Sequence, residues 1–337
     1  MSKIVFRCDM DRASGFGHFY RCVDLARNIK ILRPGVGISF LGRYEGLAIT
    51  LLEREAFSWI TLREEIGFGL RSTLEYSRSQ DILFIDTYQI SNSDISQLKT
   101  QSIKHGTKLA FFDDFGTLDF NDVNLVINFR VEAESLYRYA SKKEAKGTRY
   151  YPSSPSLKNT REKRLGSFTP ELKKVLIFVG GVDLHNVSAQ LLQASERAFD
   201  SAEIRFVLPQ TSKIKVPIKP GRAGTKILSS VPDLSILLAD SDLVICGGGK
   251  LKYDAAFACI PSACLSQSEG QDQDTVLFEK AGLTHNLGMA AGARPDSLYE
   301  KLLALRSDSF REKQFQVGKE KFFSVSAENA ANIVVNI

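Results

Sequence analysis

Residues 4–18 read IVFRCDMDRASGFGH, and the predicted fold follows from this stretch. The apolar run Ile4-Val5-Phe6 predicts a buried strand from Ile4 to Cys8, and Gly15 and Gly17 allow the tight backbone of a loop. His18 then opens a helix whose apolar residues recur on one face: Phe19, Cys22, Leu25, Ala26 and Ile29. A strand, a glycine loop and a helix N-terminus are typical of parallel α/β sheets, in which ligands bind at the carboxyl ends of the strands.

Length and composition indicate a globular protein of two domains. The chain has 337 residues, of which 43% are hydrophobic and 25% charged, as in ordinary soluble proteins. It has no apolar run of membrane-spanning length, and no signal peptide precedes the first strand, so we expect a cytoplasmic protein with no integral membrane segment. Five cysteines without a Cys-x-x-Cys pair fit reduced thiols. The net charge of +5 is spread widely, which argues against a nucleic-acid partner.

Strands and helices alternate along both halves of the chain. In the first half, helices separate predicted strands at residues 4–8, 37–42, 59–62, 81–86, 108–112 and 125–128. After a polar, proline-containing stretch at 130–171, the pattern restarts with strands at residues 174–179, 203–208, 225–228, 242–246 and 262–265. The alternation predicts two doubly wound, Rossmann-like domains that face each other across a cleft. We place these domains at residues 1–155 and 171–325, an irregular linker at 156–170, and a C-terminal helix, packed back on the first domain, at 326–337.

Glycine clusters follow two predicted strands of the second half. The pairs Gly180-Gly181 and Gly248-Gly249 are candidates to hold a diphosphate through backbone N–H groups and a helix dipole, although either cluster alone is also typical of a tight turn. The spacing after Gly15-Phe16-Gly17 does not fit a nicotinamide site, and no Gly-Lys-Ser/Thr motif is present. The histidines and cysteines lack metal-ligand spacing, so we expect neither a metal nor another cofactor.

Several motifs together resemble a known family. Its most specific motif is similar to Phe6-Arg7-Cys8-Asp9 followed by Gly15-Phe16-Gly17-His18 and Arg21. By its position three residues after His18, Arg21 lies either at the site or on the exterior of the helix. Further similar blocks are Asp86-Thr87-Tyr88, Phe112-Asp113-Asp114, Ile127-Asn128, Gly147-Thr148-Arg149-Tyr150 and Val179-Gly180-Gly181-Val182-Asp183. Over nearly its whole length the chain resembles the UDP-2,4-diacetamido-2,4,6-trideoxy-β-L-altropyranose hydrolases of bacterial pseudaminic acid synthesis. The resemblance implies the two-domain GT-B fold of many glycosyltransferases.

The resemblance also implies a reaction and roles for the first-half residues. The substrate would be a nucleotide-activated amino sugar, here a UDP-sugar, cleaved at its anomeric carbon to release the nucleotide diphosphate in nonulosonic acid or surface-polysaccharide synthesis. His18 is implied as the general base for water, a role that suits an imidazole titrating near neutrality. Asp9 would bind the sugar or orient His18, and Arg7 would pair with Asp9 or face phosphate. Asp86 and Tyr88 follow a buried strand, where Tyr88 would stack on or hydrogen-bond to the sugar.

The second half departs from the family in its glycine loop. Lys250 and Lys252 follow the glycines where the family commonly has small hydroxyl residues, and Asp254 stands where it commonly has Glu. The lysines would either neutralise the diphosphate or face solvent. Asp254 would accept hydrogen bonds from ribose hydroxyls, and Gln271 and Asp274 would lie beside the phosphates or the sugar.

Two alternatives stay open beside hydrolysis. A GT-B glycosyltransferase would use His18 to deprotonate an acceptor hydroxyl, and transfer to a lipid would need an exposed apolar or basic patch that the sequence of the first half does not contain. A sugar-nucleotide-binding protein without activity is suggested only by the altered residues 250–254, and the presence of His18 argues against it.

Overall fold

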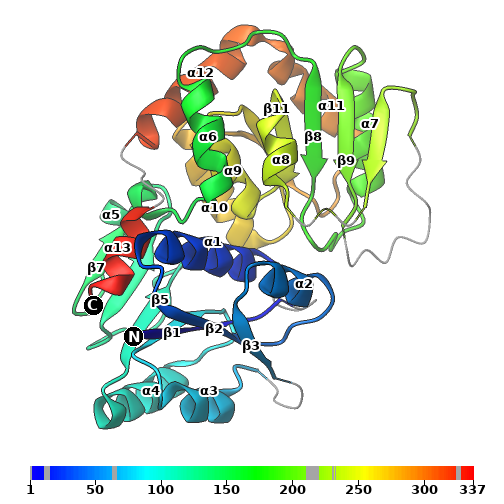
Figure 1. Cartoon of the computed structure of the whole chain (residues 1–337). Helices are drawn as coiled ribbons and strands as arrows, with labels where there is room; N and C mark the ends of the chain where they lie inside the picture. Colours follow the sequence, from blue (N-terminus) through cyan, green and yellow to red (C-terminus); the bar gives the residue numbers. More distant parts are fainter. Residues whose placement is uncertain are drawn as a thin grey trace. The chain divides into compact units, whose positions relative to one another are not determined.

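The structure, a computed structural model, describes residues 2–10, 16–62, 67–209, 220–229, 231, 233–323 and 328–337. The chain forms two compact units, one comprising Met1–Pro155 with Val325–Ile337 and the other Ser156–Ser324. In each unit, helices lie against the faces of a parallel sheet (Figure 1).

The described residues of the first unit form a seven-stranded parallel sheet in the order β3-β2-β1-β4-β5-β6-β7. Its strands are β1 Lys3–Cys8, β2 Gly37–Gly42, β3 Ser58–Thr61, β4 Ile82–Asp86, β5 Lys108–Phe112, β6 Leu125–Asn128 and β7 Glu144–Lys146. Its helices are α1 Gly17–Leu32, α2 Leu47–Arg54, α3 Leu70–Ser77, α4 Asn92–His105, α5 Ala133–Leu136, the 3-10 turn η1 Thr148–Tyr150 and α13 Glu328–Val335. Helix α13 packs against α1, and Asn329 at its start donates a hydrogen bond of 2.9 Å to the carbonyl oxygen of Arg149.

Both faces of the first sheet are buried. On one face Phe6 lies 5.2 Å from Phe40 and 5.3 Å from Phe84, measured between ring centroids, and Phe19 of α1 lies 6.0 Å from Phe40. On the other face, residues of the central strands pack with side chains of α3 and α4: Val5, Leu83, Ile85, Leu109, Phe111 and Val126 with Leu74, Ile95 and Leu98. Because helices cover both faces, the strands are continuous apolar runs rather than alternating ones.

The described residues of the second unit form a six-stranded parallel sheet in the order β10-β9-β8-β11-β12-β13. Its strands are β8 Lys174–Phe178, β9 Glu203–Val207, β10 Thr225–Leu228, β11 Leu243–Gly247, β12 Ser262–Ser266 and β13 His285–Met289. Its helices are α6 Pro155–Arg164, α7 Ser188–Ala198, α8 Ser235–Ala239, α9 Lys250–Phe257, α10 Glu269–Lys280, α11 Pro295–Leu303, the 3-10 turn η2 Ala304–Arg306 and α12 Asp308–Lys321. One face of the sheet is buried under α7 and α11, through Leu191, Leu192, Leu298 and Leu302.

The two sheets share one strand order, which decides where ligands can bind. In each unit the first strand along the chain pairs with the fourth, so β1 lies beside β4 and β8 beside β11. The chain leaves these neighbouring strands toward opposite sides of the sheet, and in open α/β sheets ligands bind at the carboxyl ends of such strand pairs. The carboxyl ends of these two strand pairs are therefore the candidate sites of the two units.

The edge strands β7 and β13 and the helices α5 and α6 were not predicted from the sequence. β7 lies within residues 130–171, which we predicted to be irregular, and β13 lies where no strand was predicted. Both are short edge strands; in β7 only Ala145 is buried. An edge strand has one neighbour and needs no continuous apolar run, so its hydrophobic pattern is weaker; β3 and β10 were predicted nevertheless, whereas β7 and β13 were not.

The predicted irregular linker at 156–170 is largely the helix α6. The prediction of irregular structure was wrong. Polar contacts, as well as apolar packing, hold α6 in place. The guanidinium of Arg161 is buried and donates to the carbonyl oxygens of Phe257, at 2.5 Å, and Lys319, at 3.1 Å. A helix docked in part by a buried arginine has too weak an apolar stripe to be recognised in the sequence.

Gly247 ends β11 where that strand approaches β8. A Cβ atom at this position would lie 2.1 Å from the carbonyl oxygen of Val179. We expect Gly247→Ala to destabilise the second unit by about 1–3 kcal/mol, because the backbone of β8 has to move. Hydrogen exchange of the β8 and β11 amides measures the loss. Gly249→Ala is the matched control, since a Cβ there meets nothing within 4 Å; equal protection in the two variants would contradict the explanation.

Candidate active site

The first candidate site lies where β1 and β4 end side by side. His18 is in the first turn of α1, and Asp86 is the last residue of β4. The imidazole Nδ1 of His18 is 2.6 Å from Oδ1 of Asp86. In the sheet Cys8 pairs with Asp86, so the strand order brings together two residues that are 68 positions apart in the chain.

Arg21 joins Asp86 to a second carboxylate. Its Nε and Nη2 donate to Asp86 at 2.5 Å each, and its Nη1 donates to both oxygens of Asp114 at 2.9 and 3.0 Å. The guanidinium also lies over the rings of Phe112 and Phe129, at 5.1 and 5.4 Å from their centroids. We call His18, Asp86, Arg21 and Asp114 the His18 cluster; all four are less than a tenth exposed.

Asp86 is ionised and orients the imidazole. Burial alone would raise the pKa of Asp86, but the charges and hydrogen bonds of Arg21 and His18 lower it to about 2. Arg21 Nη2 lies 3.1 Å from the same Nδ1 and can only donate, so the shorter contact with the carboxylate assigns the imidazole proton to Nδ1. The lone pair is then on Nε2, to which no described residue hydrogen-bonds. A histidine held in this way can accept a proton through Nε2.

The pairing of Asp86 with Arg21 and His18 predicts that the free energy of unfolding decreases at acid pH. Its pKa is lower in the folded protein than the ~3.9 of an unfolded chain, so its stabilising contribution is complete above that value and is lost as the pH falls toward 2. The full contribution is about 2 kcal/mol. Urea unfolding at several pH values between 5 and 2.5 measures it. We expect Asp86→Asn to lose less stability over this range than the wild type, and parallel losses would contradict the assignment.

Tyr88 lies at the edge of the His18 cluster. Its hydroxyl donates to Asp114 at 2.5 Å, and its ring stands edge-on to the imidazole of His18, with centroids 4.3 Å apart and an interplanar angle of 85°. The residue is nevertheless 61% exposed. Its hydroxyl is therefore engaged with Asp114, whereas its ring is open to a ligand beside His18.

Asp9 and Arg7 form a separate buried group. Asp9 accepts hydrogen bonds of 2.8 Å from Arg7 Nη1 and from Arg43 Nη2 and one of 2.9 Å from the Arg43 amide. Arg7 also donates to the carbonyl oxygen of Phe68, and both side chains are fully buried. Of the two alternatives for Arg7, pairing with Asp9 is thus the one observed. The carboxylate that orients His18 is Asp86 rather than Asp9.

The predicted glycine loop is only partly described. Gly15 lies outside the described residues. At Gly17 a Cβ atom would meet no described atom within 4 Å, so packing among these residues does not require a glycine there.

In the second unit, the glycines follow β8 and β11. Gly180 has φ of 128°, a conformation that favours glycine, and Gly181 is half-buried. Gly248 has no space for a side chain, because a Cβ atom there would lie 2.9 Å from both Gln271 and Thr275. Gly249 precedes α9, has open space beside it and has no side-chain cap on the helix. The amides at the start of α9 are thus the better placed of these groups to meet an anion.

The two lysines of this loop differ in their surroundings. Lys250 Nζ pairs with both oxygens of Asp254 at 2.8 and 2.9 Å. Lys252 is fully buried, and its Nζ binds the carbonyl oxygen of Gly248 at 2.7 Å, Oδ2 of Asp274 at 2.8 Å and Thr275 at 3.2 Å. The prediction that Lys252 contacts the diphosphate or faces solvent was therefore wrong; its ammonium lies beneath the glycine loop.

Asp274 and Gln271 belong to α10. Asp274 also accepts hydrogen bonds from the hydroxyl of Tyr253 at 3.0 and 3.1 Å, so its carboxylate joins α9 to α10. Gln271 accepts one of 3.0 Å from the Gln267 amide and supports the turn before α10. A contact of either residue with a ligand stays a prediction.

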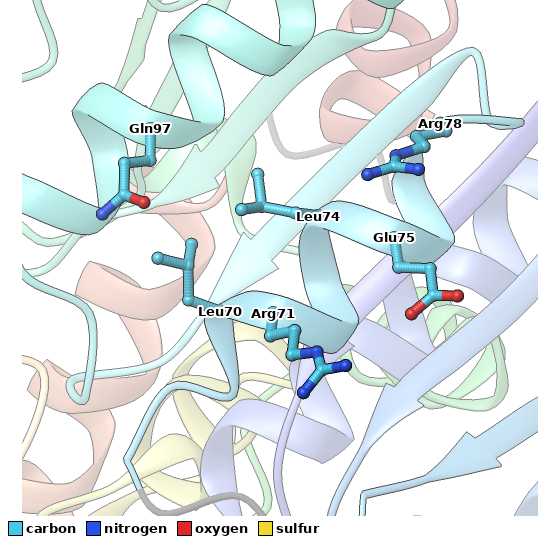
Figure 2. Close-up of a pocket in the computed structure, with 6 residues that line it drawn as sticks. All are labelled: Leu70, Arg71, Leu74, Glu75, Arg78 and Gln97. Atoms are coloured by element: carbon cyan, nitrogen blue, oxygen red, sulfur yellow. The ribbon is translucent and has the colours of Figure 1, made fainter.

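The first unit also contains a pocket between α3 and α4 (Figure 2). It is lined by Leu70, Arg71, Leu74, Glu75, Arg78 and Gln97. These helices pack on the sheet face that carries Val5, whereas α1 packs on the face that carries Phe6. The pocket is therefore separate from the His18 cluster.

Neither a metal-binding cluster nor a membrane-spanning helix is present in the part of the chain that the structure describes. It contains no group of three or more His, Cys, Asp or Glu side chains arranged to hold a metal ion. None of its helices has the length and hydropathy required to cross a bilayer.

Arg21 and Asp114 belong to motifs of the family resemblance, but the sequence assigned neither of them a role in the site. The sequence leaves Arg21 undecided between the site and the helix exterior, and it gives Asp114 only the general expectation for an acid at a strand end. The sequence does not carry this signal, because Arg21 and Asp114 meet only through the strand order, which places β4 and then β5 beside β1. Side chains that leave the start of α1 and the ends of β4 and β5 then meet at one edge of the sheet.

Comparisons with known proteins give the fold. No model of a protein family matches the chain, and no curated protein matches it. Among solved structures it is similar to MurG of Acinetobacter baumannii, with a TM-score of 0.61, 11% identity and 100% of each chain covered. It is also similar to UGT89C1 of Arabidopsis thaliana complexed with UDP (0.66, 12%, 100% of this chain and 99% of that one) and to the glycosyltransferase SnogD of Streptomyces nogalater (0.64, 15%, 99% of each). The predicted GT-B fold of two Rossmann-like domains is thereby confirmed.

Proposed function

We propose that this chain is an enzyme that transfers the sugar of a nucleotide-activated sugar to a hydroxyl group, with His18 as the general base. The observation that carries the proposal is the His18–Asp86 pair at the carboxyl ends of β1 and β4. The proposal is supported by the GT-B fold, which the chain shares with several solved glycosyltransferases.

In the proposed reaction, Nε2 of His18 takes the proton of the acceptor hydroxyl as its oxygen attacks the anomeric carbon. The bond from that carbon to the phosphate oxygen breaks, and the nucleoside diphosphate leaves with the bonding electrons. Asp86 stabilises the imidazolium that forms, as a carboxylate does in related histidine–carboxylate pairs. One displacement of this kind inverts the configuration at the anomeric carbon.

The second unit is proposed to hold the nucleotide. The amides around Gly249 and Gly180 would bind the diphosphate, aided by the N-terminus of α9. Lys250 and Asp254 would meet the phosphate and the ribose, since their paired side chains lie on the first turns of the same helix. In the first unit the open ring of Tyr88 would pack on the sugar beside His18.

Hydrolysis is the second candidate, with water in place of the acceptor. It is favoured by the resemblance of the motif from Arg7 to His18 to the pseudaminic-acid pathway hydrolases, and a UDP-activated amino sugar is the substrate that this resemblance suggests. The base, the leaving group and the inversion are the same, so the two candidates differ only in the nucleophile.

A release assay tests the proposal. The protein is incubated with UDP-, CDP-, GDP- and dTDP-activated amino sugars, and free nucleoside diphosphate is measured with and without a panel of sugar and alcohol acceptors. Release that requires an acceptor supports transfer, and equal release in its absence supports hydrolysis. Binding of a nucleotide sugar without release under either condition would contradict an enzymatic role.

A further inference from the structure

Asp114 is a buried carboxylate that the proposed reaction does not use. It lies at the carboxyl end of β5, and no hydrogen bond joins it to His18. Its contacts are instead with the Nη1 of Arg21 and the hydroxyl of Tyr88. Burial would raise the pKa of Asp114, but the charge and hydrogen bonds of Arg21 lower it, so the group is ionised at neutral pH.

The carboxylate of Asp114 changes the net charge of the His18 cluster. Arg21 binds Asp86 through two nitrogens, so its positive charge lies beside the carboxylate that faces His18. With these two groups alone, the surroundings of the imidazole would be close to neutral. Asp114 adds a second negative charge on the far side of the guanidinium. The cluster then carries one net negative charge when His18 is neutral and none when His18 is protonated.

Several other ionisable groups lie near the His18 cluster. Beside Arg21, Asp86 and Tyr88, Cys22 contacts Asp86. Arg130 donates to the carbonyl oxygen of Asp114 and to the hydroxyl of Tyr137. Arg7, Asp9 and Arg43 form their own group at the end of β1. Asp113 accepts from the Tyr139 hydroxyl and the Gly116 amide rather than from Arg21. Asp11 and Arg12 lie outside the described residues.

We propose that Asp114 strengthens His18 as a base by cancelling the charge of Arg21, so that the charge of Asp86 acts undiminished on the imidazole. Asp114 is thus a positioning residue that acts through Arg21. Loss of its charge leaves a guanidinium whose field opposes the protonation of His18. The catalytic consequence rests on the proposed function, but the electrostatic effect on His18 does not.

A titration of the histidine ring signals by NMR tests this without a substrate. The full chain carries 13C-labelled histidine, and His18→Gln identifies the His18 signal. We expect the midpoint of the His18 titration to fall by roughly 0.5–1 pH unit in Asp114→Asn, and by more in Asp86→Asn, which also loses the hydrogen bond to Nδ1. The matched control is Asp113→Asn, which removes the adjacent buried carboxylate and is expected to shift the midpoint by less than half as much.

A double variant separates charge from packing. Arg21→Gln removes the positive charge and should raise the midpoint, whereas Arg21→Gln with Asp114→Asn removes both charges and should return it close to that of the wild type. A wild-type midpoint in Asp114→Asn, an equal shift in Asp113→Asn, or a double variant that follows Arg21→Gln would each overturn the proposal. Should Asp114→Asn not fold, the comparison of Arg21→Gln with the double variant still decides. Because no nucleotide sugar is present, these outcomes are independent of those of the release assay.

Discussion

Replacing His18 by glutamine is expected to lower the rate of nucleoside diphosphate release by roughly 10²- to 10⁴-fold. A glutamine amide fills much of the same space and retains hydrogen-bonding groups near Asp86, but it cannot accept the proton from the attacking hydroxyl or water. The nucleotide sugar should still bind, because the groups proposed to hold the nucleotide belong to the second unit. The loss should therefore be in kcat, with KM changed much less.

Initial rates with the best nucleotide sugar from the release assay measure this effect. His105→Gln is the matched control, since His105 ends α4 on the exposed surface of the same unit. A His18→Gln enzyme within threefold of the wild-type kcat would rule out His18 as the base.

Replacing Lys252 by methionine is expected to destabilise the second unit by about 3–5 kcal/mol. The side chain is fully buried, and its ammonium binds Asp274, Thr275 and the carbonyl oxygen of Gly248. Methionine keeps most of the volume but withdraws the positive charge from a buried carboxylate and removes a hydrogen bond from the glycine loop. The cost comes chiefly from the negative charge that stays buried.

Urea unfolding followed by far-UV circular dichroism, with hydrogen exchange of the α9 and α10 amides, measures the loss. Lys226→Met is the control, because Lys226 pairs with Glu203 at an exposed position where such pairs contribute about 0–1 kcal/mol. Adding Asp274→Asn to Lys252→Met removes the unpaired charge and should recover part of the stability. Equal losses in Lys252→Met and Lys226→Met would show that the buried pair has no such role.

The core strands were predictable because each carries its own signal. Strands such as β1, β4 and β11 are buried on both faces and are therefore continuous apolar runs bounded by polar or glycine residues. The start of α1 was also predictable, because the glycines and His18 come after the first strand in the sequence. The edge strands β7 and β13 lack that signal. Each has one neighbouring strand and is only partly buried, so its residues need not form a continuous apolar run.

The sequence by itself determined the two α/β halves, the position of His18 after the first strand and the glycine loops after β8 and β11. Only the tertiary structure decided the partners: Asp86 rather than Asp9 orients His18, Arg21 and Asp114 complete its surroundings, and Lys252 lies beneath the glycine loop. Local periodicity reflects which residues are buried, whereas the pairing of buried charges depends on which strands become neighbours. That choice is made by the strand order, which places β4 against β1, as in the pairing of Cys8 with Asp86, and so brings His18 to Asp86 across 68 residues of chain.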